Sequence, residues 1–168
     1  TQEDSKEIKN LIKDFLLNYT GNLVFHNLLY DDKVLIYELF MEHDTDWKGM
    51  REGLRVAAKH DDSMVVAYLA TNNAVENKLG LKELAYEFLG DWGEDVEDIS
   101  SIYIDRLLEY NLKDCLATFY VWNKFYQKMI DDNQKHFYDT IAKPSLKISI
   151  KMMLTGLPID MGKVQEGK

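Results

Sequence analysis

The chain has 168 residues, of which 46% are hydrophobic and 12% aromatic, with nine glycines and two prolines. This composition predicts one globular unit with a sizeable core and excludes a disordered or linker-rich protein. The net charge of −9 opposes broad attraction to nucleic-acid phosphates, although clustered carboxylates that hold divalent cations would supply local positive charge.

The first part of the chain predicts two helices around a short strand. Apolar residues recur at helical spacing over residues 1–19, and residues 20–22 end this helix. Residues 23–26 form a short apolar run, which we interpret as a buried strand that ends at Asn27. Helical spacing then resumes over residues 31–41.

The next part predicts a second strand and a capped helix. Residues 42–48 are polar and typical of a loop, and residues 55–58 are interpreted as a short strand. Asp62-Ser63 has the character of an N-cap for a helix over residues 64–71.

The remainder of the chain predicts three helices. The first covers residues 81–89, and the acidic stretch 91–100 that follows is interpreted as a solvated loop. The second covers residues 101–131, and the third runs from about residue 134 to 154 with a bend or restart near Pro144. The chain is therefore predicted to be a helix-rich α/β protein with very few strands.

Cysteine content and hydropathy bear on the cellular setting. The single Cys115 excludes an internal disulfide, and no Cys and His spacing resembles a zinc site. No run approaches about 18 apolar residues, and the polar N-terminus is no signal peptide. We expect a soluble, cytoplasmic protein that does not bind a membrane.

Two short segments carry residues suited to chemistry. Asn27, Tyr30 and Asp31 follow the carboxyl end of the predicted strand at residues 23–26. Open α/β sheets bind ligands at this end of their strands. Tyr110 and Asp114, four residues apart in a predicted helix, share one helix face. Each segment alone also fits a turn with a helix cap, or an aromatic residue beside a surface charge. Their combination and order favour a functional site.

These segments resemble two motifs of the ribonuclease-H-like proofreading nucleases. Asn27-x-x-Tyr30-Asp31 is similar to their second exonuclease motif, and Tyr110-x-x-x-Asp114 to the third motif of their tyrosine subclass. Taken together, they point to the 3′→5′ exonuclease domain of a bacteriophage-type family-A DNA polymerase.

The segments around these motifs resemble the same family. Asp62-Ser63-Met64 is similar to its Asp-Thr-Met, residues 79–85 to its Gly-Leu-Lys-x-Leu-Ala, and residues 113–118 to its Lys-Asp-x-Asp-Ala-Thr. Leu116 stands where the family has a second Asp that is not the principal ligand. Residues 152–160 resemble the start of a polymerase region. The resemblance therefore implies an exonuclease domain over residues 1–132 and a helix leading into a polymerase domain over residues 133–168.

The resemblance implies two-metal hydrolysis at the 3′ end of single-stranded DNA, with Mg²⁺ or Mn²⁺ as cofactor. Asp114 would ligate the metal that activates water, and Asp31 would hold the second metal. Tyr110 would orient the water, and Asn27 and Tyr30 would lie against the terminal nucleotides. His26 is interpreted as a packed strand residue and not as a base.

The family also has an Asp-x-Glu motif on the first strand of its sheet, ahead of the helix that residues 3–19 resemble. This sequence begins at that helix, so we expect a partial ribonuclease-H-like fold that lacks its first three strands. Two of the four expected carboxylates are then absent, and the chain alone is expected to have little or no nuclease activity. The remainder of the polymerase chain is the expected partner.

Two alternatives remain open at this level. The chain could belong to a 3′→5′ exoribonuclease of the same superfamily, although the polymerase-like tail argues against this. It could also be a non-catalytic structural module, but all five motif residues fit the nuclease pattern.

Overall fold

The computed structural model describes residues 2–71, 78–92, 103–157 and 162–163. These parts are rich in helix and poor in strand, as predicted. The elements are α1 (Gln2–Asn18), β1 (Val24–Phe25), α2 (Leu28–Phe40), α3 (Trp47–Ala57), β2 (Asp61–Asp62), α4 (Ser63–Thr71), α5 (Leu81–Leu89), α6 (Ile104–Asp131), α7 (Lys135–Phe137), the π-helix η2 (Tyr138–Ala142) and α8 (Lys143–Thr155). Most of the acidic stretch 91–100, from residue 93 onward, lies outside the described residues.

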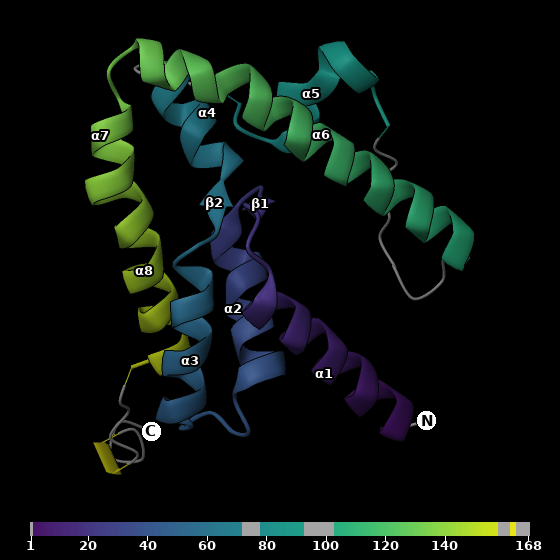
Figure 1. Cartoon of the computed structure of the whole chain (residues 1–168), viewed down its shortest axis with the longest axis vertical. Coiled ribbons are helices and arrows are strands. Elements are labelled where there is room, and N and C mark those ends of the chain that lie inside the picture. Colours follow the sequence, from purple (N-terminus) through teal and green to yellow (C-terminus); the bar gives the residue numbers. More distant parts are fainter. Residues whose placement is uncertain (1, 72–77, 93–102, 158–161, 164–168) are drawn as a thin grey trace.

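The helices form two groups that meet at the strand pair (Figure 1). In one group, α4 and α5 pack against the long helix α6 around a core that includes Val66, Ala85 and Val121. In the other group, α2, α3 and α8 pack around Ile36 and Ile150, and α1 lies against α2. The helices α7, η2 and α8 descend from the end of α6 and connect the two groups. No helix in the described ranges is long and apolar enough to cross a membrane.

The two strands are parallel and very short. Val24 is paired with Asp61 and Phe25 with Asp62. This is the predicted first strand, reduced to its two central residues. The pair is compatible with an α/β chain but is too small to establish a ribonuclease-H-like sheet.

The strand predicted at residues 55–58 is wrong. Residues 55–57 belong to α3, whose buried positions Met50, Leu54 and Ala57 recur at helical spacing and face α2. The helices approach closely because Gly53 lies against Ile36, where an added Cβ would lie 2.8 Å from Cγ2. Residues 55–58 resemble a short strand in the sequence because the apolar residues that complete the helical spacing lie earlier in the chain.

Most predicted helices are confirmed, with shifted ends. The second helix begins at Leu28, three residues earlier than predicted, directly after Asn27 adopts a left-handed conformation with φ of 65°. The predicted restart near Pro144 is present as the π-helix that precedes α8, and Pro144 lies in the first turn of α8. The Lys143 N–H is bonded to the Tyr138 carbonyl oxygen five residues earlier, and Pro144, which has no N–H, cannot continue this hydrogen-bond pattern.

The predicted N-cap at Asp62 is confirmed, and Asp62 caps a second helix as well. Its carboxylate accepts from the Met64 N–H at 2.8 Å at the start of α4. It also accepts from the Asn27 and Leu28 N–H groups at 3.2 and 3.0 Å, where β1 passes into α2. The side chain is almost fully buried. One carboxylate therefore joins two helix starts that are distant in the chain.

Three further polar contacts lie at or beside β2. The Tyr138 hydroxyl donates to Asp61 Oδ1 at 2.8 Å, and Lys143 Nζ donates to the same oxygen at 2.7 Å. His60 Nδ1 lies 2.7 Å from Asp32 Oδ1, and both side chains are buried. Burial raises the pKa of Tyr138, which keeps the hydroxyl protonated as a donor. These contacts hold η2, α8 and α2 against the second strand.

The substitution Asp62→Ala tests the double cap. It leaves three backbone N–H groups without their acceptor, one buried and two partly buried, so we expect the free energy of unfolding to fall by about 3 kcal/mol. Urea unfolding followed by circular dichroism measures this loss. The control is Asp46→Ala, because Asp46 caps a single helix start, that of α3, through the Gly49 N–H, and otherwise accepts from the Glu42 N–H. Equal losses in the two variants would contradict the double-cap interpretation.

Candidate functional site

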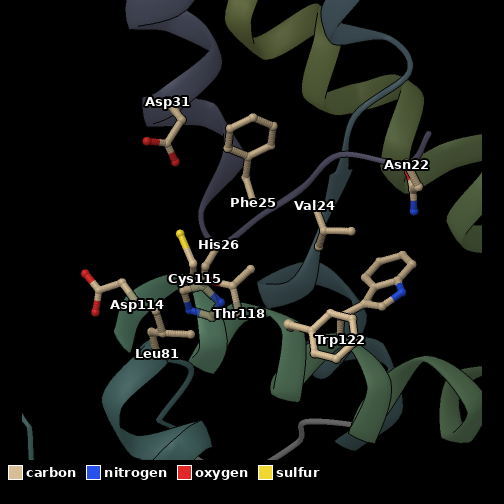
Figure 2. A pocket seen from close by; sticks show the side chains of 11 residues that line it. Asn22, Val24, Phe25, His26, Asp31, Leu81, Asp114, Cys115, Thr118 and Trp122 are labelled. Atoms are coloured by element: carbon tan, nitrogen blue, oxygen red, sulfur yellow. The ribbon is translucent and has the colours of Figure 1, made fainter. Parts of the chain in front are cut away.

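A cavity of about 510 Å³ lies beside β1, where α2, the start of α5 and α6 approach one another. Asp31 lines it from α2 and Asp114 from α6. Figure 2 shows Asp31 and Asp114 on the same side of the view, Asp31 above and Asp114 below, with the Cys115 side chain at a height between them. Two aspartates that are far apart in the sequence therefore line one cavity.

Asp31 lies in the first turn of α2, at the carboxyl end of β1. Its position follows from the turn at Asn27 and from the cap that Asp62 provides to this helix start. Burial raises the pKa of the Asp31 carboxyl, and the negative charges of Asp32 and Asp62 raise it further. The site thus contains a half-buried carboxylate in a negative surrounding.

Asp114 lies on α6, next to the apolar stripe that faces α4 and α5. Ala117, Val121 and Phe125 on this stripe are buried, which fixes the rotation of the helix about its axis. Asp114 Oδ1 accepts a hydrogen bond of 3.0 Å from the indole Nε1–H of Trp92, which follows α5. The carboxylate is therefore held by a side chain from another element.

The other three predicted site residues do not line this cavity. Tyr110 lies one turn before Asp114 on α6, and Lys82 Nζ is 5.9 Å from the centre of its ring. Tyr30 is 62% exposed, and the backbone N–H of the exposed residue Asn27 is bonded to Asp62. Of the five predicted site residues, only the two aspartates line the cavity.

His26 lines the cavity, and both of its ring nitrogens are engaged. Nε2 lies 2.9 Å from the Leu79 carbonyl oxygen, and Nδ1 lies 2.9 Å from Ser63 Oγ. Because a carbonyl oxygen can only accept, Nε2 carries a proton. This arrangement supports a packed role for His26 and leaves neither nitrogen free to act as a base.

Asp31 and Asp114 are the cavity residues suited to a metal. Carboxylate oxygens are ligands that hard cations such as Mg²⁺ and Mn²⁺ prefer, so the donor chemistry fits these ions. Within the described ranges, no group of three or more His, Cys, Asp or Glu side chains gathers closely enough to hold a metal. Two carboxylates alone make a low-affinity site that further ligands would have to complete.

No protein-family model, curated protein or solved structure matches this chain. A functional assignment therefore depends on the order of the sequence motifs and on the geometry of the cavity. Among the residues that these motifs name, Asp31 and Asp114 are the pair that the fold brings to one place.

Sequence reasoning did not identify Trp92 as part of the site. Trp92 lies in the acidic stretch that was interpreted as a solvated loop, yet it is half-buried and donates to Asp114. A large aromatic residue within a run of carboxylates was the available signal. Burial of such a side chain lowers the free energy, so its segment is expected to pack against a core.

The pKa of His26 can be measured directly. Burial lowers the pKa of His26 below 6.5, and this outweighs the hydrogen bond to Leu79 and the charges of Asp62 and Asp114. A lowered folded-state pKa means that the neutral ring is favoured by folding. The stability that His26 contributes is therefore present above about pH 6.5 and is lost as the pH falls through the folded-state pKa.

We expect the His26 ring resonances to titrate with a midpoint below 6.5 in a ¹H–¹³C NMR experiment on the folded chain. The variant His26→Gln assigns the signal, and the same ring in the urea-unfolded chain provides the reference. A folded-state midpoint at or above the unfolded value would show that burial does not control this ring.

Proposed function

We propose that the chain is the 3′→5′ proofreading exonuclease portion of a DNA-directed DNA polymerase. The observation that carries this proposal is that Asp31 and Asp114 line the same cavity. They are the aspartates of two motifs that the sequence places in the order typical of these nucleases. The carboxyl end of β1, where Asp31 follows, is also where α/β proteins bind ligands.

The proposed reaction is hydrolysis of the 3′-terminal phosphodiester. Divalent cations, when bound, lower the pKa of the attacking water and stabilise the charge on the leaving oxygen. Asp114 and Asp31 would hold these cations, and Tyr110, one turn before Asp114 on the same face of α6, would orient the water. Asn27 and Tyr30, both exposed beside the start of α2, contact the terminal nucleotides. His26 takes no part in proton transfer in this proposal.

Efficient catalysis requires the remaining carboxylates of the family, which an Asp-x-Glu strand supplies. β1 is paired with β2, and within the described residues its opposite edge carries no further strand. An unpaired strand edge is a template for pairing with another strand, so this edge is the proposed position of the Asp-x-Glu strand. With two of four carboxylates, the chain alone binds cations weakly and hydrolyses DNA slowly or not at all.

The tail is proposed to lead into the polymerase region. Residues 133–168 include α7, η2 and α8, and α8 packs against α2 and α3 through the buried Ile150. This segment is therefore anchored on the helix that carries Asp31. The polymerase-like character of the tail is the reason for favouring DNA over RNA as substrate.

Metal binding is the first test of the proposal. We expect Mn²⁺ to bind with a dissociation constant on the order of 1 mM, measured by the loss of the free Mn²⁺ signal in electron paramagnetic resonance. Asp31→Asn and Asp114→Asn should each weaken binding about 10-fold, because each removes one of two anionic ligands. The control Asp105→Asn changes an exposed carboxylate in the first turn of α6 and should bind like the parent chain.

If neither substitution weakens binding relative to Asp105→Asn, the cavity is not a metal site, and the nuclease proposal loses its basis. The double variant Asp31→Asn/Asp114→Asn gives the background from other carboxylates of this acidic chain.

Binding of single-stranded DNA should depend on the cation. The net charge of −9 repels phosphates, so a fluorescent oligothymidylate with a free 3′-hydroxyl should bind in Mn²⁺ and dissociate when EDTA is added. Fluorescence anisotropy measures binding, and chromatography measures release of nucleotides, which should be slight. Equal binding with and without Mn²⁺ would argue against a metal-dependent nuclease site.

The same assay separates the alternatives. An oligouridylate that binds more tightly than oligothymidylate would favour the exoribonuclease. An absence of Mn²⁺-dependent binding to either strand would favour a non-catalytic structural module. The double variant at Asp31 and Asp114 is the matched control for both strands.

A further inference from the structure

Trp92 makes a contact that the proposed reaction does not use. Its indole Nε1–H donates to Asp114 Oδ1 at 3.0 Å. An indole N–H can only donate and carries no charge, so Trp92 is neither a ligand nor a base. The contact engages one oxygen of a carboxylate that faces the cavity from α6.

The position of this donor is fixed by packing. The Trp92 ring packs against the core of α4, α5 and α6, which includes Ala85, Ala117 and Val121. The Asp114 backbone belongs to α6, which is held in the same core. Donor and acceptor are therefore anchored independently on the same packed unit.

Metal-ligating carboxylates are commonly held by an outer hydrogen-bond donor that fixes their orientation. An anchored donor on Oδ1 restricts rotation of the carboxylate and reduces the entropy that is lost when the other oxygen, Oδ2, binds a cation. A phenylalanine at the same position would fill similar space without restricting the carboxylate. The hydrogen bond therefore has a consequence that packing alone does not explain.

We propose that Trp92 is a positioning residue: its hydrogen bond orients the carboxylate of Asp114 for cation binding. This inference rests on the proposed function, because it requires Asp114 to be a metal ligand. Trp92 touches neither the cation nor the substrate and acts through the orientation of Asp114.

The Trp92 indole proton reports on this role without any substitution at the site. In ¹H–¹⁵N spectra of the chain, each of the three tryptophans gives one indole resonance, and Trp47→Phe and Trp122→Phe identify the one from Trp92 by elimination. We expect this resonance to move progressively as Mg²⁺ is added, whereas that of the exposed Trp47 on α3 stays in place. In Asp114→Asn, the Trp92 resonance should no longer respond to Mg²⁺.

The variant Trp92→Phe removes the donor and keeps an aromatic ring. We expect its Mn²⁺ affinity to fall about 10-fold. Trp47→Phe is the control, since Trp47 is an exposed tryptophan on α3 that does not line the cavity. It should retain the parent affinity. If Trp92→Phe does not fold, the Mg²⁺ response of the Trp92 resonance in the parent chain decides the question.

The outcomes separate this inference from the proposed function. Suppose that Asp114→Asn weakens Mn²⁺ binding. The role of Trp92 alone would then be overturned if Trp92→Phe kept the parent Mn²⁺ affinity, or if the Trp92 indole resonance did not shift when Mg²⁺ was added. Mn²⁺ binding that is insensitive to Asp114→Asn would overturn the metal site itself and the role of Trp92 with it.

Discussion

One buried carboxylate holds the two groups of helices together. Asp62 accepts hydrogen bonds from the N–H groups of Asn27, Leu28 and Met64, so the starts of α2 and α4 converge on a single side chain. These N–H groups lack acceptors within their own helices. Burying a charge is costly unless it is hydrogen-bonded, and three donors offset part of that cost. The penalty that remains is the physical reason why burial raises the pKa of Asp62.

The geometry of the candidate site follows from this constraint. Asp62 fixes the start of α2, and the first turn of α2 carries Asp31. The helix that Asp62 caps on its other side, α4, packs directly on α6, which carries Asp114. The two aspartates are therefore related through a capped helix start and a packed helix pair. In a site built in this way, the distance between the two carboxylates is fixed by the packing of the core.

Local signals in the sequence were sufficient for most helices and for part of the site. The helices α1, α5 and α6 follow from apolar spacing and from stop signals such as Gly90, which adopts a positive φ. The cap at Asp62 was also visible, because an N-cap involves residues adjacent in sequence. Asp31 and Asp114 were found by motif spacing, and the fold places both in one cavity.

What could not be predicted depends on contacts between distant residues. The pairing of Tyr138 with Asp61 and that of Trp92 with Asp114 leave no periodic pattern in the sequence. From the sequence alone, a Tyr or Trp is interpreted as a core residue, since most of its surface is apolar. Its role as a hydrogen-bond donor becomes apparent only when the structure shows its partner. Motif spacing therefore identified side chains that face the cavity, but not those that hold them in place. Because the orientation of a carboxylate decides how it can bind a cation, the unpredicted contacts determine whether the predicted residues can work as a site.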